Sequence, residues 1–255
     1  MSYQFRPQKP TLSEMRMRAS PAKRWLSEGQ RCEEQGRYPE ALAAYEKALE
    51  LDPKNAWIWV WKGSMLLALN RFEEARSVFE QARVLNPKNA VAASGAGTAL
   101  ASLGRWKEAV APLEEALQLD PKDAAAAYHL GVVLAKLKRY PEALAAFEQA
   151  LKLDRTLVDA WVGKGAALYT LKRYVEALAA QEQAIALNPT LALAYLNKGN
   201  ALFRLRRYEE ALVAYERSIT LHPAERTAYY NKARILWRLR RYKEAAAALR
   251  RLRLR

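Results

Sequence analysis

Proline residues recur along this chain at intervals of 34 residues or a multiple of 34, at Pro53, Pro87, Pro121, Pro189 and Pro223. Arg155 stands at the one vacant place in this series. A fixed interval of this length predicts a stack of equivalent structural units, because each unit buries its apolar face only against its neighbours. The units begin at Ala22, Ala56, Ala90, Ala124, Val158, Ala192 and Arg226.

Each unit carries the pattern of two packed helices. The eighth place is small, as Gly29, Gly63, Gly97, Gly131, Gly165, Gly199 or Ala233. The seventeenth place is aromatic, as Tyr38, Phe72, Trp106, Tyr140, Tyr174, Tyr208 or Tyr242, and an alanine follows three residues later. Large residues beside small ones let the ridges of one helix fill the grooves of another. Where the proline is present near the end of a unit, it stops the second helix.

Three segments carry a family resemblance. Trp59-x-x-Lys62-Gly63, Tyr195-Leu196-Asn197-Lys198-Gly199-Asn200 and Tyr208-Glu209-Glu210-Ala211-Leu212 resemble the tetratricopeptide repeat, and the resemblance covers residues 22–255. It implies an all-α fold, a right-handed α-solenoid (superhelix) of seven antiparallel helix-turn-helix repeats. In such a fold the first helices line a concave face and the second helices form the back.

The ends of the repeat array lead to further expectations. Residues 1–21 form a basic leader, in which residues 12–19 could fold as a short helix that caps the first repeat. Residues 22–255 are predicted to form a single solenoid, with no separate C-terminal cap over Leu249 and Leu252. Inside the array, Pro112 is expected to kink a second helix. Gln181 stands where neighbouring repeats place an aromatic residue, which predicts looser packing in the fifth repeat.

The charge of the chain is concentrated at its ends. The formal net charge is +15, and residues 204–255 alone hold fifteen Lys/Arg against five Glu. The single cysteine, Cys32, excludes an intramolecular disulfide and fits a reducing compartment. No secretory or membrane-spanning apolar stretch is visible, so the sequence predicts a cytoplasmic protein without membrane insertion.

Motifs of enzyme chemistry lack their structural context. Gly95-Ala96-Gly97 lies within a predicted helix, with no preceding strand to form a phosphate-binding loop. His129 and His222 fall in different repeats, and Cys32 has no histidine base at helical spacing. We therefore predict no enzyme, no metal site and no cofactor.

The first candidate for a binding surface is the concave groove. The second, fifth, sixth, ninth, twelfth and thirteenth places of each first helix should point into it. In repeats two to five these places are mostly apolar or small and include Trp57, Val60, Trp61, Ser64, Tyr128, His129 and Tyr169. A groove of this kind suits an amphipathic helix or an extended apolar segment of a partner. Alternatively, some of these side chains only pack neighbouring first helices together.

The second candidate is a polar cluster on the first helices of repeats six and seven. Its residues are Asn197, Asn200, Phe203, Tyr230, Asn231, Arg234, Trp237 and Arg238. Asparagine amides donate and accept at once, so such a cluster suits the backbone of an extended peptide. Related repeat proteins that bind a C-terminal carboxylate need Lys and Asn where Val162 and Ala166 stand here, which argues against that mode of recognition.

The third candidate is a ridge of cations at the turn inside each repeat. It includes Arg173, Arg206, Arg207, Arg240 and Arg241. Stacked repeats would align these residues along one edge, where they could follow a phosphate backbone. A glutamate three residues after each arginine of the series Arg37 to Arg241 could instead neutralise it.

Three functional hypotheses follow. The leading one is a non-catalytic scaffold that binds a partner helix or extended peptide in its concave groove. The first alternative is binding of nucleic acid or another polyanion through the basic ends and the arginine ridge. The second alternative is a subunit or module of a larger assembly that docks through its last helix.

Overall fold

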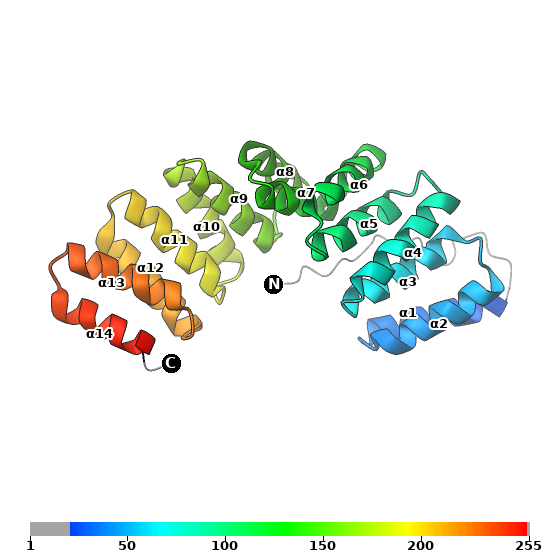
Figure 1. Cartoon of the computed structure of the whole chain (residues 1–255), viewed down its shortest axis with the longest axis horizontal. Coiled ribbons are helices and arrows are strands. Elements are labelled where there is room, and N and C mark those ends of the chain that lie inside the picture. Colours follow the sequence, from blue (N-terminus) through cyan, green and yellow to red (C-terminus); the bar gives the residue numbers. More distant parts are fainter. Residues whose placement is uncertain (1–20, 254–255) are drawn as a thin grey trace. The chain divides into compact units, whose positions relative to one another are not determined.

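The chain is an all-α solenoid of helical hairpins in this computed structural model, which describes residues 21–253 and the side chains of residues 22–250 (Figure 1). The described residues form fourteen helices and no strand. The helices are α1 (Pro21–Glu34), α2 (Tyr38–Leu51), α3 (Ala56–Ala68), α4 (Phe72–Leu85), α5 (Ala90–Ser102), α6 (Trp106–Leu119), α7 (Ala124–Lys136), α8 (Tyr140–Leu153), α9 (Val158–Thr170), α10 (Tyr174–Leu187), α11 (Ala192–Arg204), α12 (Tyr208–Leu221), α13 (Arg226–Arg238) and α14 (Tyr242–Arg253).

Side-chain caps start several of the first helices. The Oδ1 atom of Asn55 accepts a hydrogen bond from the backbone N–H of Trp57 at 3.1 Å, and Asn89 accepts from Ala92 at 3.0 Å. Asp123 and Glu225 cap α7 and α13 in the same way. These bonds satisfy backbone donors that the first helical turn leaves without a partner.

A left-handed residue ends each first helix and turns the chain into the second. The φ angle is +71° at Gly36 and +74° at Gly104, and it lies between +58° and +63° at Asn70, Lys138, Lys172, Arg206 and Arg240. The backbone N–H of the next residue donates a hydrogen bond to the carbonyl oxygen five residues earlier, as from Arg71 N to Leu66 O at 2.8 Å. This is the hydrogen-bond pattern of a helix C-terminal cap, for which glycine is the usual residue.

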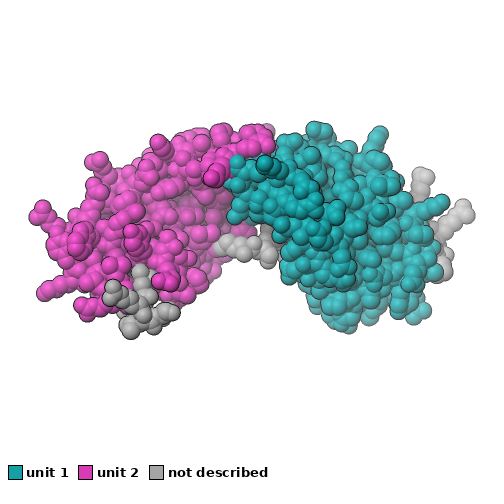
Figure 2. Space-filling model, viewed as in Figure 1, with its two compact units in different colours: residues 1–137 teal, residues 138–255 magenta. Residues whose placement is uncertain are grey.

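The chain divides into two compact units, residues 1–137 and residues 138–255 (Figure 2). Within each unit, every described helix packs against the next one along the chain. First helices of neighbouring hairpins also approach each other: α3 contacts α5 and α5 contacts α7, while α9 contacts α11 and α11 contacts α13. We call the side formed by these helices the first-helix face.

Each unit has its own apolar core, built from large side chains beside glycines. In the first unit a Cβ atom at Gly63 would lie 2.8 Å from the Phe79 ring, and in the second a Cβ at Gly199 would lie 2.6 Å from the Tyr215 ring. Both rings are fully buried. The small residue at the eighth place is therefore needed for the close approach of the two helices in a hairpin.

Pro112 and Gln181 are both accommodated inside regular second helices. Helix α6 runs without interruption from Trp106 to Leu119 although Pro112 lies inside it. Gln181 is buried on α10, and its Nε2 donates to the carbonyl oxygen of Val162 at 3.2 Å. Leu249 on α14 is partly exposed. The expected helix at residues 12–19 lies outside the described residues, as does the side chain of Leu252.

Candidate functional site

The groove residues predicted in repeat two lie mainly in the core of the first unit. Val60 and Trp61 have no exposed surface, and Ser64 is also buried, with its hydroxyl donating to Val60 O at 2.9 Å. The Trp61 ring packs 5.8 Å from the Tyr45 ring, between centroids. Only Trp57 is partly accessible in this group. Val60, Trp61 and Ser64 are therefore packing residues in the described structure.

The predicted residues of repeats four and five are partly accessible. Tyr128 and His129 lie on α7 with their ring centroids 5.1 Å apart. Although His129 is partly accessible, its imidazole Nε2 is buried, and this burial lowers the pKa of the ring to about 4, so the ring is neutral at pH 7. Tyr169 on α9 lies edge-on to Tyr174 at 5.5 Å, between centroids.

The asparagines of repeats six and seven hold two first helices together. Asn200 Oδ1 accepts one hydrogen bond from the Tyr215 hydroxyl at 2.8 Å and another from Asn231 Nδ2 at 2.9 Å. Asn231 is buried. Asn200 and Asn231 thus connect α11 to α12 and α13, whereas Asn197 is half-buried and has no hydrogen-bond partner among the described side chains.

Three arginine side chains of the second unit lie over aromatic rings. The Arg234 guanidinium carbon is 4.2 Å from the centre of the Phe203 ring, and that of Arg238 is 5.4 Å from the Tyr208 ring. Arg204 lies 4.6 Å from Tyr174. Helices α11 and α13 contain neither Asp nor Glu. None of these three arginines has an ion pair with a carboxylate in the described part of the chain.

Two large aromatic side chains remain exposed beside these arginines. Trp237 is 66% exposed and Tyr230 is 57% exposed. Together with Phe203, Arg204, Arg234 and Arg238 they form what we call the arginine–aromatic surface. Its arginines form no ion pair with a described carboxylate, and its Trp237 and Tyr230 rings are more than half exposed. We take this surface as the candidate binding site.

Sequence reasoning missed the role of Arg204, although a periodic signal was present. A basic residue at the thirteenth place lies over the aromatic residue thirty positions earlier in three cases. These pairs are Lys136 with Trp106, Arg204 with Tyr174, and Arg238 with Tyr208. Each pair joins two neighbouring repeats. The signal in the sequence is a basic residue at the thirteenth place of one repeat together with an aromatic residue at the seventeenth place of the repeat before it.

The predicted arginine ridge separates into two classes. Arg173, Arg207 and Arg241 each make a two-pronged contact with a glutamate, such as Arg173 Nε to Glu176 Oε1 at 2.7 Å. The hydrogen bond from Arg173 lowers the pKa of the Glu176 carboxyl. Arg206 and Arg240 are exposed and have no carboxylate partner among the described residues. In repeat one the pattern differs, because Arg37 donates to Cys32 Sγ and to Gln35 instead.

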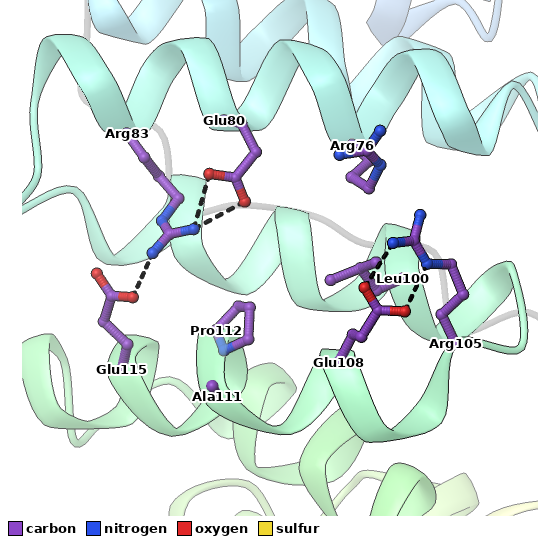
Figure 3. Close-up of a pocket in the computed structure, with 9 residues that line it drawn as sticks. All are labelled: Arg76, Glu80, Arg83, Leu100, Arg105, Glu108, Ala111, Pro112 and Glu115. Carbon is purple, nitrogen blue, oxygen red and sulfur yellow. Dashed lines mark hydrogen bonds and ion pairs between the residues drawn. The ribbon is translucent and has the colours of Figure 1, made fainter.

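A hollow of about 410 Å³ lies between α4 and α6 in the first unit (Figure 3). Its charged side chains neutralise one another: Arg83 donates to Glu80 at 2.7 Å and to Glu115 at 2.5 Å, and Arg105 donates to Glu108. The hollow is also open to solvent on its outer side. We interpret it as an ion-pair network that joins two second helices.

Among the described residues, no group of three or more His, Cys, Asp or Glu side chains is placed to hold a metal ion. No helix there is long and apolar enough to cross a membrane.

Comparison with known proteins gives consistent matches. Models described as tetratricopeptide repeat match residues 33–96 and residues 94–157, 139–192 and 196–255. No curated protein sequence matches the chain.

Solved structures also resemble the chain. YrrB, described as a tetratricopeptide repeat protein with an unusual peptide-binding site, is 27% identical over 74% of this chain and 97% of its own, with a TM-score of 0.65. PilF of Pseudomonas aeruginosa is 22% identical, with 81% and 94% covered and a TM-score of 0.72. PilW, a type IV pilus biogenesis factor, is 20% identical, with 81% and 96% covered and a TM-score of 0.72. At their low identities, the last two support the fold alone.

Proposed function

The chain belongs to the tetratricopeptide repeat family, and from this premise we propose that it is a protein-interaction scaffold that binds an extended segment of a partner protein. The proposed binding site is the arginine–aromatic surface on α11 and α13. The exposed pair of Trp237 and Tyr230 is the observation that carries this proposal, because the two rings lie seven residues apart on one face of α13, and an exposed apolar patch marks an interaction site.

The surroundings of the two rings favour a peptide ligand. Trp and Arg are the residue types that most often dominate the energy of protein interfaces, and Trp237 and Arg234 lie on the same helix. The bonded set of Asn200, Asn231 and Tyr215 fixes α11 against α13 before a ligand arrives. A preformed site of this kind lowers the entropy cost of binding. The resemblance to YrrB, whose description includes a peptide-binding site, also supports the proposal.

The test selects ligands and then removes the proposed contacts. A library of displayed random peptides is panned against the full chain, and the affinities of the enriched peptides are measured by fluorescence anisotropy. We expect Trp237→Ala to weaken binding at least tenfold, which corresponds to about 1.4 kcal/mol. The matched control is Val213→Ala, because Val213 is also 66% exposed but lies on the second helix α12.

The control should change the affinity by less than about twofold, since most surface contacts contribute little. Both substituted side chains are exposed, so thermal unfolding followed by circular dichroism should show the fold unchanged. Enriched peptides that bind Trp237→Ala and Tyr230→Ala as tightly as the original chain would rule out this surface. A panning experiment that enriches no peptide would count against the scaffold itself.

A further inference from the structure

The left-handed turn residues differ systematically between the two units. In the first unit these residues are Gly36, Asn70 and Gly104, the types that tolerate a positive φ best. In the second unit they are Lys138, Lys172, Arg206 and Arg240, with φ angles of +62° to +63°. Long cationic side chains thus stand at four places where the backbone favours glycine.

A left-handed conformation disfavours Lys and Arg relative to Gly, because their Cβ atom crowds the neighbouring carbonyl. The turn itself does not require the cation, since Gly36 and Gly104 make it in the first unit. A structural role of the side chain could be an ion pair, but none of the four cations has one with a described carboxylate. The nearby acids are engaged elsewhere: Glu176, Glu210 and Glu244 bind Arg173, Arg207 and Arg241.

Aromatic residues are tied to the same turns. The backbone N–H of Lys172 donates to Tyr169 O at 3.0 Å, that of Arg206 to Phe203 O at 3.1 Å, and that of Arg240 to Trp237 O at 3.0 Å. In three successive repeats a cation therefore follows an aromatic residue of the first-helix face by one turn. At the last of them, Trp237 and Tyr242 lie edge-on with ring centroids 5.0 Å apart, and both are more than half exposed.

We propose that this turn edge of the second unit binds single-stranded nucleic acid. Lys172, Arg206 and Arg240 contact successive phosphates, and Trp237 with Tyr242 offers a surface on which an unpaired base stacks. Rows of cations beside exposed aromatic rings are the means by which proteins bind single strands without reading their sequence. Cations alone would serve an anionic membrane surface, whereas the exposed ring pair favours a ligand with planar groups. This proposal does not depend on peptide binding by the arginine–aromatic surface.

The key variant replaces the three cations by the residue that the backbone prefers. Lys172→Gly, Arg206→Gly and Arg240→Gly, combined in the full chain, remove three charges without opposing the turn. Thermal unfolding followed by circular dichroism should show this variant at least as stable as the original chain. Lost binding therefore cannot be attributed to lost folding.

The matched control removes the same charge from another place. Lys54, Lys88 and Lys122 are exposed and occupy equivalent turns between repeats in the first unit. The control variant carries Lys54→Gln, Lys88→Gln and Lys122→Gln, so its net charge equals that of the glycine variant.

The measurement is the fluorescence anisotropy of labelled 20-nucleotide oligouridylate and oligodeoxythymidylate between about 50 and 200 mM salt. Each phosphate contact on a single strand contributes about 0.7 to the slope of log affinity against log salt, so the glycine variant should lose about 2 from this slope. We expect its affinity at 50 mM salt to fall at least tenfold, and that of the control to change less than about threefold. A loss of binding to both oligonucleotides shows that the three cations contact the phosphates that the two strands share, and weaker binding of a duplex reports the contribution of unpaired bases.

Four results would overturn the proposal. They are no binding of either oligonucleotide at 50 mM salt, an equal loss in the control variant, binding of a duplex of the same length as tightly as the single strand, and binding only to vesicles that contain phosphatidylserine. Peptides selected on the arginine–aromatic surface provide a separate readout. They should bind the glycine variant as before, so the two proposals can fail independently.

Discussion

Gln181 is a polar residue at a place where the other hairpins have a large aromatic or aliphatic side chain. Tyr45, Phe79, Leu113 and Tyr215 occupy the same place in other second helices, each beside a glycine of the first helix. Gln181 fills this place in the fifth repeat and is buried. Its Nε2 is bonded to Val162 O, but its Oε1 is buried without a hydrogen-bond partner in the described part of the chain. A buried acceptor of this kind costs stability.

We predict that Gln181→Leu raises the free energy of unfolding by about 1–3 kcal/mol, because it removes the unpaired acceptor and keeps a side chain of similar size. Leu113 occupies the corresponding place beside Gly97, which indicates that leucine fits between such helices. Urea unfolding of the full chain measures the change. Gln183→Leu on the exposed side of the same helix is the control and should change stability by less than about 0.5 kcal/mol. A destabilised Gln181→Leu variant would show that the hydrogen bond from Gln181 Nε2 to Val162 O stabilises the fold by more than the unpaired Oε1 destabilises it.

At the scale of the helices, the 34-residue period predicted where elements begin. Helices α3, α5, α7, α9, α11 and α13 start at the predicted residues Ala56, Ala90, Ala124, Val158, Ala192 and Arg226. The period did not predict which side chains a neighbouring helix covers. Leu67 and Trp237 both stand at the twelfth place of a first helix, yet Leu67 is buried while Trp237 is 66% exposed. Trp237 lies in the last described hairpin, after which no described helix follows to cover it, and the repeat frame treats all hairpins as equivalent.

Arginine–glutamate pairs at the start of the second helices should make the stability depend on pH. Hydrogen bonds from arginine lower the pKa of Glu176, Glu210 and Glu244 in the folded chain. A lowered folded-state pKa adds stability above the unfolded value of about 4.3, and this stability is lost as the pH falls through the folded value. We expect the triple Glu→Gln variant at these positions to be less stable than the original chain at pH 7, and this deficit to shrink as the pH falls below about 4 towards 3.

Urea unfolding at the two pH values tests this expectation. The control carries Glu34→Gln, Glu50→Gln and Glu114→Gln, which removes the same charge from exposed acids for which no ion pair is found among the described residues. A control that loses as much stability at pH 7 would assign the effect to net charge. A deficit as large near pH 3 as at pH 7 would contradict the role of the paired carboxylates.

At the scale of the whole molecule, the division into two units falls inside the fourth repeat of the sequence frame, between α7 and α8. The 34-residue period gives no sign of this position, because it treats all seven repeats as equivalent. Each unit has a core of its own. Trp61 and Phe79 belong to the core of the first unit, and Leu168 and Tyr215 belong to that of the second.

Because stability in repeat proteins is largely the sum of repeats and their nearest-neighbour contacts, a cut that leaves both cores whole should be tolerated. We predict that the fragments 1–137 and 138–255 are each helical and unfold cooperatively in urea, as measured by circular dichroism. The control cut follows Leu103 and separates α5 from α6, which pack together in one hairpin. It should leave the fragment 104–255 with a less cooperative transition, because Leu113 and Ala109 lose the helix that buries them. An unfolded 138–255 fragment would mean that the second unit needs the first for its stability, although the two have separate cores.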